Sequence, residues 1–382
     1  MKGGGNTENL PKITRAYLIV TNQCQLRCRY CWTHKDSGAM DTGTALAAIK
    51  FVIQNAEDEG VTPHFDFFGG EPLLRWDEVI VPCVQYIRNV YKKPCELGIT
   101  TNCLLLDEDK LRFLSENNVG MLVSMDGARE THDLNRPFAG GGGSFDAVVE
   151  KAQLILKHYP NISVRMTLTP ETAGRLHEDV QFLQSVGFKQ VECVPNVFVT
   201  WPDDVMAQLH TQLRQLSDDY LEHYPAKGFH EFERTFRNVK KMNYAYQNDL
   251  HRVNGCLRCG IGLDNQSAIN YLGDIYPCHE ANYDAALCIG NVFTGMDDAK
   301  RRSLGCSYSQ RKVRGLNCET CRYDNVCNGG CAIFNYMINR DFNIVPQMTC
   351  AWKQMMIDEA EYILSRMADL GNTVFRDYFR GL

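Results

Sequence analysis

The chain has 382 residues, of which 44% are hydrophobic and 23% are charged, and its formal net charge is −6. This balance is typical of a globular protein and excludes a disordered or fibrous chain. The length allows a full catalytic domain and a smaller second one. The lack of a concentrated Lys/Arg block argues against nucleic acid as a partner. No apolar run reaches the roughly 18 residues that span a bilayer, and residues 1–12 do not resemble a signal peptide, so we expect a cytoplasmic protein without a membrane partner.

Up to about Tyr224, short apolar runs alternate with amphipathic stretches. The apolar runs predict six strands, at Ala16–Val20, Phe65–Phe68, Leu97–Thr100, Met121–Ser124, Val164–Leu168 and Val191–Val194. Helical patterns follow: Asp41 precedes a helix over Ala45–Ala56 that Gly60 closes, and Ser144 precedes one over Ala147–Leu156. Strand–helix alternation implies parallel strands. We expect an α/β fold, a partial (β/α)6 TIM-like barrel with its working residues at the carboxyl ends of the strands; a flat doubly wound sheet is the alternative.

Beyond about Phe229 the alternation fades and cysteines become frequent. Short regular elements are expected where metal ligation supplies part of the folding energy. The pattern predicts a barrel over residues 1–228, a cysteine-rich domain over residues 229–350 and a C-terminal segment over residues 351–382. An amphipathic helix is predicted from about Ala351 to Leu370.

The chain contains 17 cysteines. Disulfide-rich secreted proteins are usually small and exported, so clustered cysteines in this chain favour metal binding or redox chemistry. Cys24, Cys28 and Cys31 form C-x3-C-x2-C directly after the first predicted strand. Three thiolates can hold three irons of a cubane and leave the fourth iron open, whereas electron-transfer clusters and structural zinc sites use four ligands. His34 as a fourth ligand would complete a zinc site, so that alternative stays open.

The triplet, with Tyr30 as the aromatic residue before its last cysteine, resembles the signature of the radical S-adenosylmethionine (SAM) superfamily. Gly69, Gly70, Glu71 and Pro72, at the end of the second predicted strand, resemble the family's GGEP element, which binds the methionine amino group of SAM. The chemistry fits, because glycine permits close backbone approach and a carboxylate accepts from an ammonium group. The alternative for the two glycines is a plain strand-to-helix turn.

Further resemblances lie at later strand ends. Asn102 lies in a T-N-C stretch that resembles the family's T-N-G, with Cys103 in place of glycine, and Ser124 and Asp126 lie in an S-x-D-G segment associated with the ribose and carboxylate of SAM. The remaining SAM contacts that the resemblance implies are Arg136, Arg165 and Val194, with Pro195 beside Val194. Ion-paired surface arginines, a turn-forming Asn102 and a simple core role for Val194 are the alternatives.

A second set of cysteines, Cys259, Cys278, Cys318, Cys321, Cys327, Cys331 and Cys350, resembles the pattern of SPASM domains, and Cys256 adds an eighth thiolate. The resemblance implies two auxiliary [4Fe–4S] clusters, and two zinc ions satisfy the same count. It assigns one cluster to Cys318, Cys321, Cys327 and Cys350. The other cluster takes Cys259, Cys278 and Cys331. Cys256 is either its fourth ligand or does not bind, which would leave one iron open. The six other cysteines (Cys83, Cys95, Cys103, Cys193, Cys288 and Cys306) are predicted to be small buried hydrophobes.

The resemblance implies an oxidoreductase with three [4Fe–4S] clusters and SAM, which is cleaved to a 5′-deoxyadenosyl radical. It also implies a peptide or protein substrate and a low-potential electron donor such as flavodoxin or ferredoxin. A thioether or carbon crosslink, or another oxidation, in a ribosomal peptide is the preferred hypothesis, and formylglycine formation by an anaerobic sulfatase-maturating enzyme is the second. The latter family has Asp after the cysteine of its Y-P-C motif, where this chain has His279 and then Glu280. These two are the candidate proton-transfer residues, and a hydrogen bond that supports the nearby cluster is the alternative for His279. The rival class is a zinc-binding interaction protein without enzymatic activity.

Overall fold

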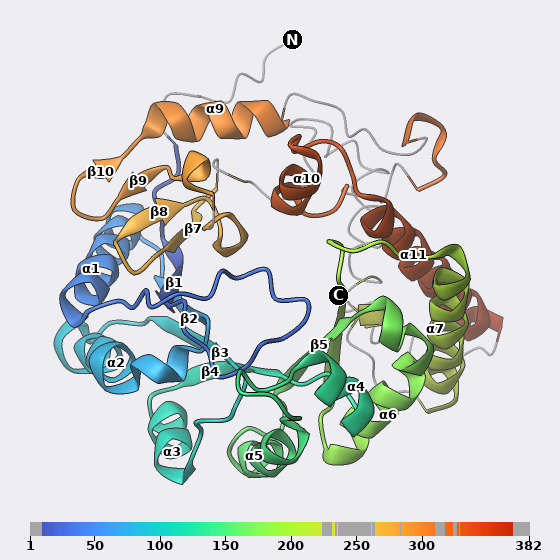
Figure 1. Cartoon of the computed structure of the whole chain (residues 1–382). Helices are drawn as coiled ribbons and strands as arrows, with labels where there is room; N and C mark the ends of the chain where they lie inside the picture. Colours follow the sequence, from blue (N-terminus) through green and yellow to red (C-terminus); the bar gives the residue numbers. More distant parts are fainter. Residues whose placement is uncertain are drawn as a thin grey trace.

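One ten-stranded sheet organises the protein, whose computed structural model describes residues 10–223, 231–233, 235, 261, 264–282, 284–309, 318–323, 327 and 329–369. The strand order is β10-β9-β8-β7-β1-β2-β3-β4-β5-β6. The first six strands pair in parallel and in chain order: β1 (Arg15–Thr21), β2 (His64–Gly69), β3 (Glu96–Thr101), β4 (Val119–Ser124), β5 (Ser163–Leu168) and β6 (Gln190–Pro195). The sheet curves around a central space, and β1 and β6 are not paired (Figure 1). The expected parallel α/β architecture is confirmed.

Helices connect the parallel strands along the outer side of the curved sheet (Figure 1). They are α1 (Thr42–Glu59), α2 (Val81–Gln85), α3 (Glu108–Glu116), α4 (Arg129–Asn135), α5 (Phe145–His158), α6 (Leu176–Val186) and α7 (Asp203–His223). The strand side chains that face these helices, such as Leu18, Phe65 and Phe67, are fully buried in the main core. This burial fixes the register of each strand, because a shift of one residue would turn the apolar face inward.

The two predicted helix starts are present, but their first residues act differently. Asp41 accepts a hydrogen bond from Thr44 N at 2.8 Å, and Gly60 ends α1 with a φ of 66°. Both are the terminal signals that the sequence predicts. Ser144 precedes α5 but makes no side-chain cap. Its hydroxyl instead donates to Arg136 O at 2.6 Å, because it is buried beside the site described below.

The cysteine-rich region continues the same sheet. Strand β7 (Gln266–Ile269) pairs in parallel with β1, and β8 (Asp274–Tyr276), β9 (Gly290–Asn291) and β10 (Gly295–Met296) follow in antiparallel order. Helices α9 (Asp298–Ser309), α10 (Ala332–Asn339) and α11 (Gln347–Asp369) complete the described part of this region. The final helix begins before the predicted Ala351, so Cys350 lies within its first turn.

A second apolar cluster joins the two regions. It includes Ile19 of β1, Ala268 of β7, Tyr276 of β8 and Ile333 of α10. Helix α11 packs beside α7 on the barrel (Figure 1). The cysteine-rich region therefore contacts both ends of the open barrel sheet.

No helix among the described residues combines the length and apolar character needed to cross a membrane.

Candidate active site

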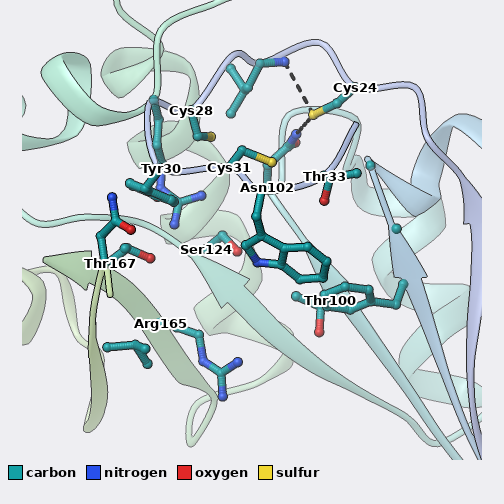
Figure 2. Close-up of a pocket in the computed structure, with 18 of the residues that line it drawn as sticks. Cys24, Cys28, Tyr30, Cys31, Thr33, Thr100, Asn102, Ser124, Arg165 and Thr167 are labelled. Atoms are coloured by element: carbon teal, nitrogen blue, oxygen red, sulfur yellow. Dashed lines mark hydrogen bonds between the residues drawn. The ribbon is translucent and has the colours of Figure 1, made fainter. Parts of the chain in front are cut away.

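A cavity of about 240 Å³ lies at the carboxyl ends of the barrel strands. The cysteine loop after β1 forms one wall, and residues from the ends of β2 to β6 form the floor (Figure 2). His279, Glu280 and Phe334 from the cysteine-rich region complete the lining. Parallel strands bring their carboxyl ends to one edge, so residues distant in the sequence meet there.

The cysteine loop is held against the segment after α4. Arg27 N donates to Pro137 O at 2.8 Å, and Arg29 N donates to Asn135 O at 2.9 Å. Cys24, Cys28 and Cys31 all line the cavity, as the spacing predicts, whereas His34 is exposed and is absent from the lining. The backbone contacts thus present the three thiols together.

The thiols are suited to bind a metal cluster. Cys24 Sγ accepts from Leu26 N at 3.4 Å and from Asn102 Nδ2 at 3.6 Å (Figure 2). Such contacts support a thiolate ligand. Burial raises the pKa of the Cys28 thiol to about 11, and the Arg136 guanidinium offsets this only in part. Metal ligation is what replaces the proton of such a thiol near pH 7.

A single metal ion and a cubane cluster require different spacings of their cysteine ligands. None of the described His, Cys, Asp and Glu side chains form a group of three or more that is spaced for one metal ion. Zinc draws its sulfur ligands to about 2.3 Å from one point, whereas the cysteines of a cubane bind separate irons. The cysteines in the described ranges are also free of disulfide bonds.

Gly69 and Gly70 are required by close backbone approach to the cysteine loop. A Cβ on Gly69 would lie 2.4 Å from Thr21 O, and one on Gly70 would lie 2.1 Å from Gln23 O. The next backbone amide, that of Glu71, donates to Gln23 O at 2.8 Å. The two glycines therefore allow the cysteine loop to pack closely against them, a role that a plain strand-to-helix turn would not require.

Glu71 is 1% exposed and reaches the cavity from this turn. Its carboxylate accepts from Thr101 Oγ1 at 2.7 Å, Asn102 N at 2.8 Å and Leu73 N at 3.2 Å. Burial raises the pKa of Glu71 to about 7 against these hydrogen bonds. A ligand ammonium group beside it would favour the charged form. Pro72 is buried in the following turn and is absent from the lining.

The later strand ends supply further lining residues. Asn102, Ser124, Arg165, Val194 and Pro195 all face the cavity. Asn102 has the turn-forming role, because its Oδ1 accepts from Leu104 N at 3.2 Å, and its Nδ2 donates to Cys24 Sγ at 3.6 Å. Arg165 is likewise ion-paired, with Glu192 at 2.7 Å, and still lines the cavity.

Asp126 differs from its neighbours because it lies behind the cavity wall. It is 0% exposed and is absent from the lining, although Tyr30 and Arg136 line the cavity. Its carboxylate accepts from Tyr30 OH at 2.6 Å, from Arg136 Nη2 at 2.9 Å and from Thr167 N at 2.9 Å. These bonds occupy the oxygens that a cofactor contact would need.

His279 and Glu280 lie on the cavity side of the cysteine-rich region. Their side chains form an ion pair at 3.2 Å, and the His279 ring packs 4.2 Å from the Tyr17 ring and 4.9 Å from the Phe68 ring. His279 Nδ1 and Glu280 Oε2 are buried and make no hydrogen bond. Unsatisfied buried polar atoms in a cavity wall are available to a ligand.

The second cysteine set forms a separate pocket. Cys318, Cys321, Cys327 and Cys350 line a space of about 40 Å³, the four residues that the resemblance groups together. Gln354 Nε2 donates to Cys350 Sγ at 3.6 Å. Cys278 and Cys331 pack in the second apolar cluster. Burial, then Glu280 and then Cys331 raise the pKa of Cys278. Cys256 and Cys259 lie outside the described residues.

The other cysteines mostly behave as small hydrophobes. Cys83, Cys95, Cys103 and Cys193 are buried, as predicted, and Cys288 is partly buried. The side chain of Cys306 lies outside the described residues.

The sequence interpretation missed several lining residues: Trp32, Thr33, Lys35, Thr167, Val197, Phe198 and Phe334. Trp32, Thr33 and Lys35 directly follow the cysteine triplet, so proximity to it was a usable signal. Phe334 lies on α10 and meets Phe198 edge to face at 5.1 Å. Only the tertiary structure brings those two together.

Known proteins match both the sequence and the fold. Residues 18–183 match the model of the radical SAM superfamily. A cysteine-type anaerobic sulfatase-maturating enzyme from Clostridium perfringens is 23% identical over 348 residues, which cover 84% of this chain and 89% of that enzyme. The structure of native anSMEcpe with bound AdoMet is 19% identical, covers 94% of this chain and 100% of its own, and has a TM-score of 0.74. Streptococcus suis SuiB bound to its precursor peptide SuiA is 16% identical, covers 89% and 76%, and has a TM-score of 0.62.

The parallel sheet, the cysteine loop and the family match define a radical SAM domain over residues 18–183. Over 84% of its length, the chain is also homologous to an anaerobic sulfatase-maturating enzyme. A radical SAM domain implies one [4Fe–4S] cluster and SAM as cofactors.

Proposed function

We propose that this enzyme oxidises a residue of a peptide or protein substrate, with SAM as the source of the initiating radical. The observation that carries the proposal is the shared cavity, which three thiols of the β1 loop and the His279–Glu280 pair line from opposite regions of the chain. When bound, the cluster and SAM supply a 5′-deoxyadenosyl radical that removes a hydrogen atom from the substrate. Cys24, Cys28 and Cys31 hold the cluster.

The cavity residues have distinct tasks in this proposal. Glu71 binds the ammonium group of SAM, since it is a buried carboxyl group in the cavity lining. Ser124, Arg136 and Asn102 offer hydrogen bonds to its other polar groups, and Val194 packs against its adenine. The enclosed walls hold the target C–H bond in place and exclude water.

His279 accepts the proton that leaves the substrate, and Glu280 orients the imidazole ring. The pair is supported by its 3.2 Å contact and by the unpartnered His279 Nδ1. An imidazole ring is a common general base in enzymes.

Two auxiliary [4Fe–4S] clusters would supply acceptors for the electron released by oxidation. One would be held by the four cysteines of the second pocket. The other would be held by Cys278, Cys331 and Cys259, with or without Cys256. The cysteine-rich domain over residues 229–350 would then be a SPASM domain. A cytoplasmic flavodoxin or ferredoxin would reduce the cluster held by Cys24, Cys28 and Cys31.

Two products are proposed. A thioether or carbon crosslink in a ribosomal peptide is favoured by His279 at the position where sulfatase maturases have Asp. Formylglycine formation is favoured by the similarity to a cysteine-type sulfatase-maturating enzyme, which extends over 84% of this chain. A peptide with a thiol or hydroxyl residue suits both chemistries, so mass spectrometry of the product distinguishes them.

The proposal is tested with protein purified and reconstituted without oxygen. The expected result is a brown protein with about twelve irons, four for each cubane, that forms 5′-deoxyadenosine from SAM after reduction. Cys28→Ala should abolish that product, whereas Cys83→Ala, which removes a buried thiol of the main core, should retain it. Reduced protein that never cleaves SAM would refute the proposal, and colourless protein with bound zinc would favour the zinc-binding interaction protein.

A further inference from the structure

Asp126 links three separate elements from behind the cavity wall. Tyr30 belongs to the cysteine loop, Arg136 follows α4, and Thr167 lies on β5, and each donates a hydrogen bond to this one carboxylate. All three donors line the cavity, while Asp126 is 0% exposed. The carboxylate therefore lies where it orients cavity residues without touching a cofactor.

The Tyr30 contact reaches farthest along the chain. Tyr30 lies between Cys28 and Cys31, and its hydroxyl donates to Asp126 Oδ2 at 2.6 Å. The Arg136 guanidinium lies 5.4 Å from the centre of the Tyr30 ring and 2.9 Å from Asp126 Oδ1. The ring is thus held by a charge-assisted hydrogen bond and a cation–π contact.

A second group of contacts fixes Asp126 itself. Its backbone N–H donates to His132 Nδ1 at 3.3 Å, and His132 Nε2 lies 3.0 Å from Ser144 Oγ. Because Ser144 donates its proton to Arg136 O, the Nε2 atom must carry the hydrogen and Nδ1 must accept. His132 is therefore neutral, in agreement with burial, which lowers its pKa to about 4.

We infer that Asp126 is a positioning residue that latches the cysteine loop, through the Tyr30 hydroxyl, into the geometry that binds SAM. The latch is the Tyr30–Asp126–Arg136 contact. It explains why a single aromatic residue with a hydroxyl group stands inside the triplet of this chain. The inference rests on the proposed role of the loop, but its central measurement does not require catalysis.

The test uses reconstituted full-length protein and Tyr30→Phe, which removes the hydroxyl and keeps the ring under Arg136. Tyr159→Phe is the matched control, because its hydroxyl donates to Val119 O at the opposite end of β4 at 3.1 Å. Hydrogen–deuterium exchange reports on the amides of Arg27 and Arg29. Exchange there should accelerate roughly tenfold in Tyr30→Phe, the scale of one hydrogen bond to a charged group, and stay unchanged in Tyr159→Phe.

SAM binding gives the second readout. The change that SAM causes in the EPR spectrum of the reduced cluster should require roughly tenfold more SAM in Tyr30→Phe, with the iron content retained. Asp126→Asn should also raise the SAM concentration that is needed. The double variant with Tyr30→Phe should need little more SAM than Asp126→Asn alone, as expected for two partners in one contact.

Unchanged exchange and unchanged SAM titration in Tyr30→Phe would overturn the latch, and so would equal losses in Tyr159→Phe. If Asp126→Asn does not fold because Arg136 loses its partner, the Tyr30→Phe comparison still decides. Failure of the proposed function appears differently, as wild-type protein that shows no EPR response to SAM at all.

Discussion

Asp179 holds the segment that directly follows Asp126. It is buried on α6 and accepts from Ala128 N at 2.9 Å and from Thr131 Oγ1 at 2.7 Å. A Cβ on the intervening Gly127, whose φ is 97°, would lie 2.4 Å from Asp179 Cβ. The S-x-D-G segment is thus fixed by a carboxyl group that the sequence pattern does not include.

This residue predicts a measurable pH dependence. Burial raises the pKa of Asp179 from 3.8 to about 7. The folded state then binds the proton more tightly, so the stability from this group is complete at low pH and is lost as pH rises through about 7. In Asp179→Asn this pH-dependent loss of stability should disappear. It amounts to at most roughly 4 kcal/mol of the free energy of unfolding in the wild type. Melting followed by circular dichroism at pH 5 and pH 8 checks this. A wild-type–variant difference that is the same at both pH values would contradict the assignment.

The sequence predicted the residues that line the cavity better than the buried residues that hold them in place. Cys24, Cys28, Cys31 and Glu71 lie in short local patterns, so the resemblance to the radical SAM motifs located them. Asp126 was expected to contact SAM, because the pattern identifies its residue type but not the direction of its side chain. Its hydrogen-bond partners lie up to 96 residues away in the chain, and no local pattern records such contacts.

Helices α7 and α11 are joined by a buried ionic contact. Glu359 of α11 is 0% exposed and accepts from Arg214 Nε at 2.9 Å and from Ser217 Oγ at 2.6 Å, both on α7. The Arg214 guanidinium also lies 3.7 Å from the centre of the Tyr362 ring. Cys350 of the second cysteine pocket lies in the first turn of the same helix, so this contact anchors one wall of that pocket to the barrel.

We predict that Glu359→Ala lowers the stability by roughly 2 kcal/mol, less than for a fully buried pair because Arg214 is partly exposed. It should also reduce the iron content by about one cluster of four irons, while 5′-deoxyadenosine formation persists. Glu361→Ala, at an exposed position on α11, is the control and should change neither quantity. Melting temperatures and iron analysis provide the measurements. An unchanged iron content in Glu359→Ala would show that the Glu359 contact does not support the second cysteine pocket.

The long parallel strands could be predicted from the sequence, whereas the short strands of the cysteine-rich region could not. The alternation of β1 to β6 with helices was readable because each strand buries one apolar face against a helix. Strands β7 to β10 are two to four residues long, too short for a periodic pattern. The pairing of β7 with β1 places Ile19 and Ala268 in one apolar cluster, which is a tertiary contact. Cys103 has a φ of 71° where the family pattern has glycine, so that backbone geometry persists without its usual residue.

At the scale of the whole molecule, α10 covers the open side of the barrel. Phe334 of α10 lines the cavity and meets Phe198, beyond β6, at 5.1 Å. This pair joins the segment after the last barrel strand to the cysteine-rich region. We therefore expect it to limit the access of solvent and oxygen to the cysteine loop.

Phe334→Ala should open that side. We expect the iron–sulfur absorbance to bleach severalfold faster in air, because the removed ring leaves the cavity more accessible. Phe342→Ala is the control, since Phe342 stacks on Tyr336 at 4.7 Å and is absent from the cavity lining. Bleaching rates followed by visible absorbance test this, and equal rates for the two variants would contradict the role of Phe334.

The parallel pairing of β7 with β1 also fixes the separation of two cysteines. The loop with Cys24 continues from β1, and Cys278 follows β8, one antiparallel neighbour beyond β7. Both cysteines therefore follow strands of one continuous hydrogen-bonded sheet. A hinge motion between the two regions would have to break the pairing of β7 with β1, so we expect the distance between Cys24 and Cys278 to stay constant while a substrate enters and leaves.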